Sequence, residues 1–344
     1  MKKTMTILLM ILSSHAFASE FLVAGCKVMN NYGVALITLP GETCLFQDNG
    51  DFISAGKDGM KYFNSQKKVL WEIPGDFHHE LDFSLDKKII LAKTQIIKPG
   101  TNGKHQMDIL MKISLDGRIL AQIDSAEILK QAGIPEMLRD LHHDPSTIKE
   151  GPTQEISHFN TLFEIPPYKN SHKNKFLRPG DYVSNNHLQG IFILSSDLKR
   201  VVHHYTVPTS RGQSLHDVQV NSDGNLIFFN NDELASPMSA KSSAVQIMNP
   251  LTKKIIFSFG SSYKPLFYSI NGGAVQMLGN DHLLISTLIS GTYLYSKKKN
   301  AIIHSTPITH FQDNKPIIVL RVKAVELSKF LAVWKVEENE PLKY

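Results

Sequence analysis

One phrase of alternating apolar residues recurs along the chain and constrains its fold more than any other feature. Copies of the phrase begin at Glu42, His79, His216 and Gly273. In each copy, apolar residues stand two and four positions after the start, and two more follow an Asn or Asp that stands seven positions after it. These turn residues are Asn49, Asp86, Asp223 and Asn280. Alternation with period two on both sides of such a turn predicts a β-hairpin.

A second hairpin, with two alternating strands around a polar turn, follows each copy, as in "MKYFNSQKKVLWEI" and "GTYLYSKKKNAIIHST". Two successive hairpins make a four-stranded sheet, and a repeated sheet of this kind is typical of a β-propeller. A fifth unit begins at His158, and a polar insert over residues 168–179 enlarges its turn.

Strands left over at the two ends of the chain complete the architecture. We predict them over residues 21–25, 32–39, 316–322 and 330–336. A sheet built from both chain ends would close the ring and remove its open edge. We therefore expect an all-β fold, a six-bladed β-propeller of four-stranded antiparallel blades, in a single domain over residues 19–344. Seven blades are the alternative.

Residues 124–152 interrupt the β pattern. Ile128, Leu129 and Ala132 fit one face of a helix, and Pro135 ends or restarts the turn. We expect a short helical insertion here, on one face of the propeller.

The first residues, "MKKTMTILLMILSSHAFASE", place Lys2 and Lys3 before a short apolar run, with small residues up to Ala18. This order predicts a secretory signal peptide over residues 1–18, cleavage near Ala18, and a periplasmic or secreted protein. No later segment is apolar over the roughly 18 residues that a membrane helix needs, so we expect no membrane span.

The chain has two cysteines, Cys26 and Cys44. An even pair in an exported protein predicts a disulfide. Two buried free thiols are one alternative. Lipid attachment at Cys26 is another, because "LVAGC" resembles a lipoprotein cleavage box.

The formal net charge is +5 at pH 7, and two of the lysines belong to the signal peptide. The remaining excess is small and its basic residues are scattered, so we expect no nucleic-acid partner. The sequence does not indicate an oligomeric state.

Several histidines open predicted strands, although a hairpin needs no histidine there. If the first strand of each unit is the innermost, its starting residue lies near the central axis. His79, His158 and His216 would then converge from three blades. The alternative is a structural role, which we expect for the doubled histidines at positions 142–143 and 203–204.

Five stretches match one known family as a set. They are "HHELDFSLD", "SHFNTLFEIP", "DYVSNNHLQGIFIL", "LHDVQVNSDGNLIFFNN" and "NGGAVQMLGNDHLLIS". In their order, spacing and residue types, the chain resembles the bacterial arylsulfate sulfotransferases over roughly residues 42–300. The members of that family are periplasmic six-bladed propellers that move a sulfuryl group from one phenol to another without a nucleotide donor.

The resemblance implies roles for five residues. His216 corresponds to the nucleophile that becomes sulfated. His79, with His78 beside it, and His158, with Asn160 nearby, correspond to the family's other site positions. The implied partners are a small aromatic sulfate donor and a phenolic acceptor, and the resemblance implies no cofactor.

The chain also departs from the family. Asn186 stands where the family keeps an arginine, and an arginine would offer a permanent charge and a fixed fork of donors to the sulfuryl oxygens. Arg211, five residues before His216, is a candidate to bind the same oxygens. The repeat starts soon after the signal peptide, so we expect no counterpart of the family's usual N-terminal β-sandwich.

A neutral imidazole is available near pH 7, because its reference pKa is about 6.5. It can attack sulfur and form a sulfohistidine, while a second histidine moves the proton. A non-catalytic propeller that binds a ligand or a protein is the alternative, and Asn186 favours it. Three histidines could also hold Zn²⁺ with one open position. Neither an "HExxH" motif nor clustered carboxylates accompany these three histidines in the sequence, so we expect no metal.

Overall fold

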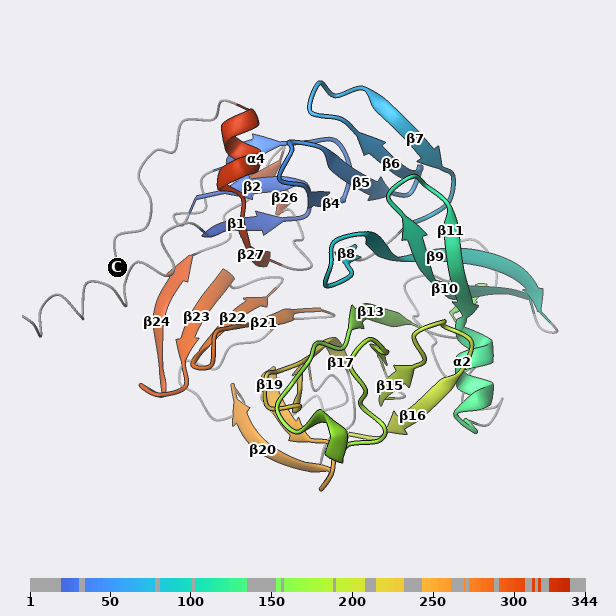
Figure 1. Ribbon diagram of the computed structural model, residues 1–344, viewed down its shortest axis with the longest axis vertical. Helices are drawn as coiled ribbons and strands as arrows, with labels where there is room; N and C mark the ends of the chain where they lie inside the picture. Colours follow the sequence, from blue (N-terminus) through green and yellow to red (C-terminus); the bar gives the residue numbers. More distant parts are fainter. Residues whose placement is uncertain are drawn as a thin grey trace, which may run out of the picture.

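The computed structural model describes most of the chain: residues 20–30, 35–77, 81–100, 103–134, 153–155, 158–187, 190–207, 215–231, 243–260, 269, 272–287, 291–306, 311–312, 315–316 and 322–334. Their strands form six antiparallel sheets arranged radially as the blades of a propeller (Figure 1). The predicted all-β, six-bladed fold is confirmed.

Each blade has four strands, which are named below from the innermost to the outermost. Blade 1 contains β27 (Val322–Glu326), β1 (Glu20–Ala24), β2 (Lys27–Met29) and β3 (Ala35–Thr38). Blade 2 contains β4 (Thr43–Phe46), β5 (Phe52–Gly56), β6 (Gly59–Phe63) and β7 (Val69–Ile73). Blade 3 contains β8 (Asp82–Phe83), β9 (Ile89–Gly100), β10 (Gly103–Ser114) and β11 (Ile119–Asp124).

The second half of the ring repeats this order. Blade 4 contains β13 (Phe159–Glu164), β14 (Tyr182–Asn186), β15 (Gly190–Leu194) and β16 (Val201–Tyr205). Blade 5 contains β17 (Leu215–Val220), β18 (Leu226–Asn230), β19 (Ala244–Asn249) and β20 (Lys254–Phe259). Blade 6 contains β21 (Ala274–Leu278), β22 (His282–Thr287), β23 (Gly291–Ser296) and β24 (Ala301–Thr306).

A few elements lie outside this scheme. They are β12 (Thr153–Glu155), which pairs in parallel with β10, the pair β25 (Phe311–Gln312) and β26 (Lys315–Pro316), and the helices α2 (Ser125–Gln131), η3 (Ser171–Lys173) and α4 (Ser328–Val333). Helix α2 begins the predicted insertion, whose remainder over residues 135–152 is outside the described residues. In the described part of the chain, no helix has the length and apolar character needed to cross a membrane.

The two ends of the chain meet in blade 1. Strand β1 pairs antiparallel with β27 from Glu20 opposite Glu326 to Ala24 opposite Val322. The prediction of two strands from each end is wrong in detail, because three strands of this blade come from the N-terminal part and one from the C-terminal part.

The strand predicted over residues 330–336 is the clearest error of the sequence-based prediction, since helix α4 contains residues 330–333; residues 335 and 336 lie outside the described part of the chain. Phe330 and Leu331 are both buried in the apolar cluster between blades 1 and 2. The Phe330 ring packs edge-on against Phe46, with centroids 4.9 Å apart, and Trp334 Nε1 donates a hydrogen bond to the Gly50 carbonyl at 2.9 Å. Tertiary packing of one side of the segment therefore overrides its strand-like composition.

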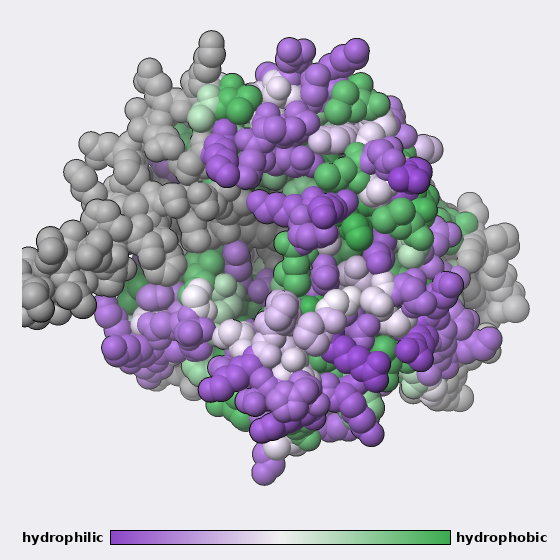
Figure 2. All heavy atoms as spheres, in the orientation of Figure 1, coloured by the Kyte–Doolittle hydropathy of each residue, from purple (hydrophilic) through white to green (hydrophobic). Residues whose placement is uncertain are grey.

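Apolar clusters fill the spaces between neighbouring blades. Val183 of blade 4 and Val218 of blade 5 belong to one cluster, and Ile247 of blade 5 and Ile285 of blade 6 to another. Both faces of a blade are therefore buried, whereas the outer strands alternate between buried and exposed residues. Figure 2 shows many hydrophilic residues on one face of the ring and a hollow near its centre.

Asx residues close the hairpins at the repeat positions. Asn49 and Asp86 each accept a hydrogen bond from the backbone N–H two residues later. In the β17–β18 hairpin this role belongs to Asn221, which accepts from the N–H groups of Asp223 and Asn225. These side-chain bonds add to the backbone hydrogen bonds of the turns and help to explain why Asn or Asp recurs there.

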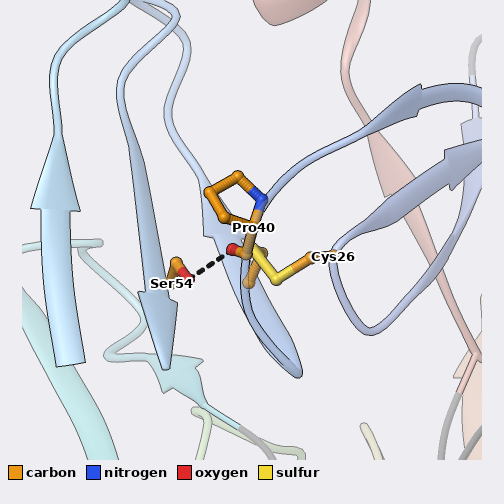
Figure 3. The surroundings of a disulfide bond; sticks show 4 residues. Cys26, Pro40 and Ser54 are labelled. Carbon is orange, nitrogen blue, oxygen red and sulfur yellow. Dashed lines mark hydrogen bonds between the residues drawn. A yellow bond between two sulfur atoms is a disulfide. The ribbon is translucent and has the colours of Figure 1, made fainter. Parts of the chain in front are cut away.

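A disulfide joins blades 1 and 2 (Figure 3). Cys26 lies in the turn between β1 and β2, Cys44 lies in β4, and their Cα atoms are 4.7 Å apart. Beside the bond, Ser54 Oγ donates a hydrogen bond to the Pro40 carbonyl at 2.5 Å. The predicted disulfide is confirmed, and it leaves no thiol at Cys26 for a lipid.

Two glycines allow the backbone to approach closely around this bond. Gly25 has φ +59°, and a Cβ there would lie 2.4 Å from the Glu42 carbonyl oxygen. Gly41 has φ +115°, and a Cβ there would lie 2.1 Å from Ser54 Oγ. A larger residue at either position would be strained by its backbone conformation and by these close contacts.

Replacing both cysteines by serine should lower the free energy of unfolding by about 3 kcal/mol, because the bond closes a loop between cysteines 18 positions apart. Urea unfolding of the double variant Cys26→Ser/Cys44→Ser, compared with the oxidised protein, measures the change. The reduced wild-type protein should match the variant. Equal midpoints for the oxidised and reduced protein would contradict the assigned role.

Candidate functional site

Three imidazole rings form a row at the inner ends of blades 4 and 5. The His187 ring lies 4.8 Å from the His216 ring and 5.9 Å from the His158 ring, centroid to centroid. Both contacts are edge-to-face, with interplanar angles of 87° and 82°. His216 is the second residue of β17 and His158 directly precedes β13. The structure thus places the rings of both His158 and His216 in contact with the His187 ring.

The backbones of the same histidines are also connected. His187 N–H donates to the His158 carbonyl at 2.8 Å, and Leu215 N–H donates to the His187 carbonyl at 2.9 Å. These bonds link β13, the residue after β14, and β17 in succession. Backbone hydrogen bonds therefore anchor the row to the ends of these strands.

Polar side chains fix the residue before His216. The Leu215 carbonyl accepts hydrogen bonds from Asn160 Nδ2 at 2.9 Å and from Asn185 Nδ2 at 2.7 Å. Thr161 Oγ1 donates to Asn185 Oδ1 at 2.8 Å. All three side chains are buried. The side-chain oxygen of Asn160, Oδ1, has no hydrogen-bond partner within the described chain. Asn160, expected to bind substrate, thus also holds the backbone next to His216.

A β-bulge directs the His216 side chain. Asp217 is the extra residue between the paired positions His216 and Val218, and its φ is +47°. Because of this extra residue, His216 and Val218 face opposite sides of the blade, although they are two residues apart. Asp217 Oδ2 accepts the Val275 N–H at 2.9 Å, which ties β17 to the inner strand of blade 6.

Strand β13 contains an equivalent bulge at Asn160. His216 precedes its bulge residue by one position, whereas His158 precedes its own by two. The expected equivalence of the two histidines is therefore off by one residue. Their rings still belong to one row, because each of them contacts the His187 ring.

Buried charged groups hold the residue after His158. Phe159 N–H donates to Asp108 Oδ2 at 2.6 Å, and Lys93 Nζ donates to the Phe159 carbonyl. Asp108 is 0% exposed and Lys93 is 1% exposed. Both lie in blade 3, so this blade fixes the position of His158 through two charge-assisted hydrogen bonds.

Some predicted site residues cannot be located in this way. His78, His79 and Arg211 lie outside the described residues. Asn186, at the position of the family arginine, is the last residue of β14 and is 1% exposed. It directly precedes His187.

His187 is the functional candidate that sequence reasoning missed. It lies within a stretch already singled out, "DYVSNNHLQGIFIL". The register of the β13–β14 hairpin points to it. Phe159 pairs with Asn186, so the next position of the ladder places His158 opposite His187. Extending the β13–β14 ladder by one residue would have found it.

The row can act as a nucleophile and as a proton carrier, because each neutral imidazole has one nitrogen that accepts and one that donates. Among the described residues, no group of three or more His, Cys, Asp and Glu side chains is arranged to hold a metal ion.

The doubled histidines of β16 contact aromatic rings instead. His203 stacks on Phe176 with centroids 4.2 Å apart and meets Tyr205 edge-on at 4.3 Å. His204 stacks on Phe192 at 4.6 Å. These contacts fit the structural role expected for the pair.

A pocket of about 410 Å³ lies elsewhere on the inner strands. Its lining includes Phe163 and Val220, at the far ends of β13 and β17 from His158 and His216. The strands rise about 3.3 Å per residue, so the pocket and the row are on the order of 10–15 Å apart.

Comparisons with known proteins identify the fold. The sequence matches no protein-family model and no curated protein. A protein of unknown function from Bacteroides caccae has a similar structure, with a TM-score of 0.56 at 9% identity, over 89% of this chain and 99% of that one. At this identity the likeness shows the propeller fold alone.

Two more distant structures have lower scores. The C-terminal WD40 domain of Sif2 gives a TM-score of 0.41 at 10% identity, over 80% of this chain and 62% of that one. BamB from Moraxella catarrhalis gives 0.40 at 8% identity, over 79% and 68%.

The surroundings of the His203 side chain make the free energy of unfolding depend on pH. Burial lowers the pKa of His203 below its ordinary value of 6.5, and repulsion from Lys253 and His204 lowers it further. The unfolded chain therefore binds more protons at this site below pH 6.5, so stability falls as the pH drops through that value.

Replacing His203 by glutamine should flatten this dependence. Urea unfolding at about pH 7.5 and about pH 5.5 should give a smaller difference for His203→Gln than for the wild type. His172→Gln, which removes an exposed imidazole in η3, is the control and should keep the wild-type difference. The same pH dependence in all three proteins would contradict the assignment.

Proposed function

We propose that the protein is an aryl sulfotransferase-like enzyme that transfers a sulfuryl group between phenolic compounds through a sulfohistidine on His216. The observation that carries the proposal is the row of His158, His187 and His216 at the inner ends of two blades. The propeller fold and the sequence resemblance to arylsulfate sulfotransferases support it.

The reaction needs two displacements. In the first, an imidazole nitrogen of His216 attacks the sulfur of an aryl sulfate, an N–S bond forms, and the S–O bond to the aryl group breaks. The phenolate leaves with the electron pair and takes a proton. In the second, the oxygen of another phenol attacks the same sulfur, the N–S bond breaks, and the acceptor loses its proton.

His187 is the group assigned to move these protons, because its ring contacts the His216 ring. As an imidazolium it protonates the departing phenolate, and as an imidazole it accepts the proton of the attacking phenol. His158 positions His187. The two rings meet edge-on, and the His158 backbone carbonyl accepts a hydrogen bond from the His187 backbone N–H.

The sulfuryl oxygens need positive charge or hydrogen-bond donors in the transition state. In place of the family arginine the chain has the neutral amide of Asn186. The proposal therefore assigns this task to Arg211, on sequence grounds, and to protonated His187. His79, with His78 beside it, remains a predicted member of the same site.

The proposal includes export, with cleavage near Ala18. The disulfide between Cys26 and Cys44 supports this location, because such bonds persist in oxidising compartments.

A non-catalytic propeller that binds a small ligand or a protein is the second candidate. Asn186 favours it, because a site without the family arginine lacks a permanent cation at that position.

An assay with 4-nitrophenyl sulfate as donor and phenol as acceptor distinguishes the two. Nitrophenolate release that depends on phenol is expected for the wild type. His216→Gln should lower the rate by about 10³-fold or more, because the nucleophile is lost. His187→Gln should lower it by about 10²–10⁴-fold, because proton transfer is lost.

His172→Gln, which changes an exposed histidine outside the row, is the matched control and should retain the rate. Mass spectrometry of the wild type after donor alone should find one added sulfuryl group on His216. Thermal unfolding confirms that the variants fold. No acceptor-dependent release by the wild type would favour the non-catalytic propeller, and full activity of His216→Gln would remove His216 as nucleophile.

A further inference from the structure

The 410 Å³ pocket at the other end of the inner strands is a second candidate site, and it does not depend on the histidine row. Four blades contribute to its wall: Asp82 from blade 3, Phe163 from blade 4, Gln219 from blade 5, and Gln276 and Met277 from blade 6. Its volume falls within the roughly 300–1,000 Å³ of small-molecule sites.

One side chain in this wall points to a ligand. Gln219 is only 8% exposed and lines the pocket. Its side-chain amide makes no hydrogen bond to any other described residue. The amide of this largely buried residue is therefore open to the pocket, where water or a ligand supplies its hydrogen-bond partners. A ligand that both accepts and donates hydrogen bonds would satisfy it.

The rim next to Gln219 is built across two blades. Ser222 Oγ donates to Asn280 Oδ1 at 3.0 Å and so joins the end of blade 5 to blade 6. Both residues line the pocket. The Asn280 side-chain oxygen is thereby engaged, so this bond fixes the rim between the two blades.

The charge of the wall selects the class of ligand. Among the described residues that line the pocket, Asp82 is the one charged side chain. One of its oxygens accepts the Phe83 N–H at 3.0 Å. A carboxylate without a lining cation disfavours sulfate, phosphate and carboxylate ligands, and it accepts hydrogen bonds from hydroxyl groups.

We propose that this pocket binds a neutral sugar. Hydroxyl groups both donate and accept, which matches the side-chain amide of Gln219. Phe163 and Met277 give apolar surface for the C–H face of a pyranose ring. The pocket has room for one or two sugar rings.

Saturation-transfer NMR on the whole protein tests the proposal with glucose, galactose, N-acetylglucosamine and maltose as probes. At least one should receive saturation from the wild type. Gln219→Leu, which keeps the size of the side chain but removes its amide, should weaken the affinity by about tenfold or more. Glucose 6-phosphate should bind more weakly than glucose.

Gln122→Leu makes the same change on the exposed outer strand β11 and should leave binding intact. Thermal unfolding of both variants shows whether they remain folded. Gln219→Asn is a second test, because it keeps the amide but shortens the side chain. The proposal is overturned if none of the four sugars binds, if Gln219→Leu and Gln219→Asn both bind like the wild type, or if glucose 6-phosphate binds as tightly as glucose.

Discussion

The pairing of β1 with β27 is the interaction on which the propeller depends. It places the two ends of the described chain in one sheet, so that the ring has no free blade edge at this point. The apolar clusters between blades require each blade to have a neighbour on both faces. Without the closing strand, blade 1 would lose its inner edge and its contact with blade 6.

The closed ring in turn fixes the histidine row. Its position results from backbone hydrogen bonds between strands, from the asparagine amides on Leu215, and from the bulges at Asn160 and Asp217. Blade 3 contributes through Asp108 and Lys93, and blade 6 through the amide of Val275. Four blades therefore determine where three rings lie, which is the rigidity that the proposed group transfer would require.

Local patterns in the sequence predicted most of the fold, because hairpins follow from alternation and Asx turns within about a dozen residues. The same patterns failed where distant contacts decide. Residues 330–333 belong to helix α4 because Phe330 and Leu331 pack in the apolar cluster between blades 1 and 2. Of the site, sequence reasoning found His158 and His216. It missed His187, because the cross-strand register of β13 and β14 includes a bulge that composition does not reveal.

The disulfide and the closing strand impose an order on assembly. Cys26 and Cys44 are 18 residues apart, so their bond can form early, before most of the ring is assembled. Strand β1 can pair with β27 only after Val322–Glu326 has been synthesised, which is nearly the whole length of the chain later. Until then its inner edge is unpaired and open to association with other chains. The early disulfide bond keeps blades 1 and 2 side by side during this interval, until β27 pairs with β1.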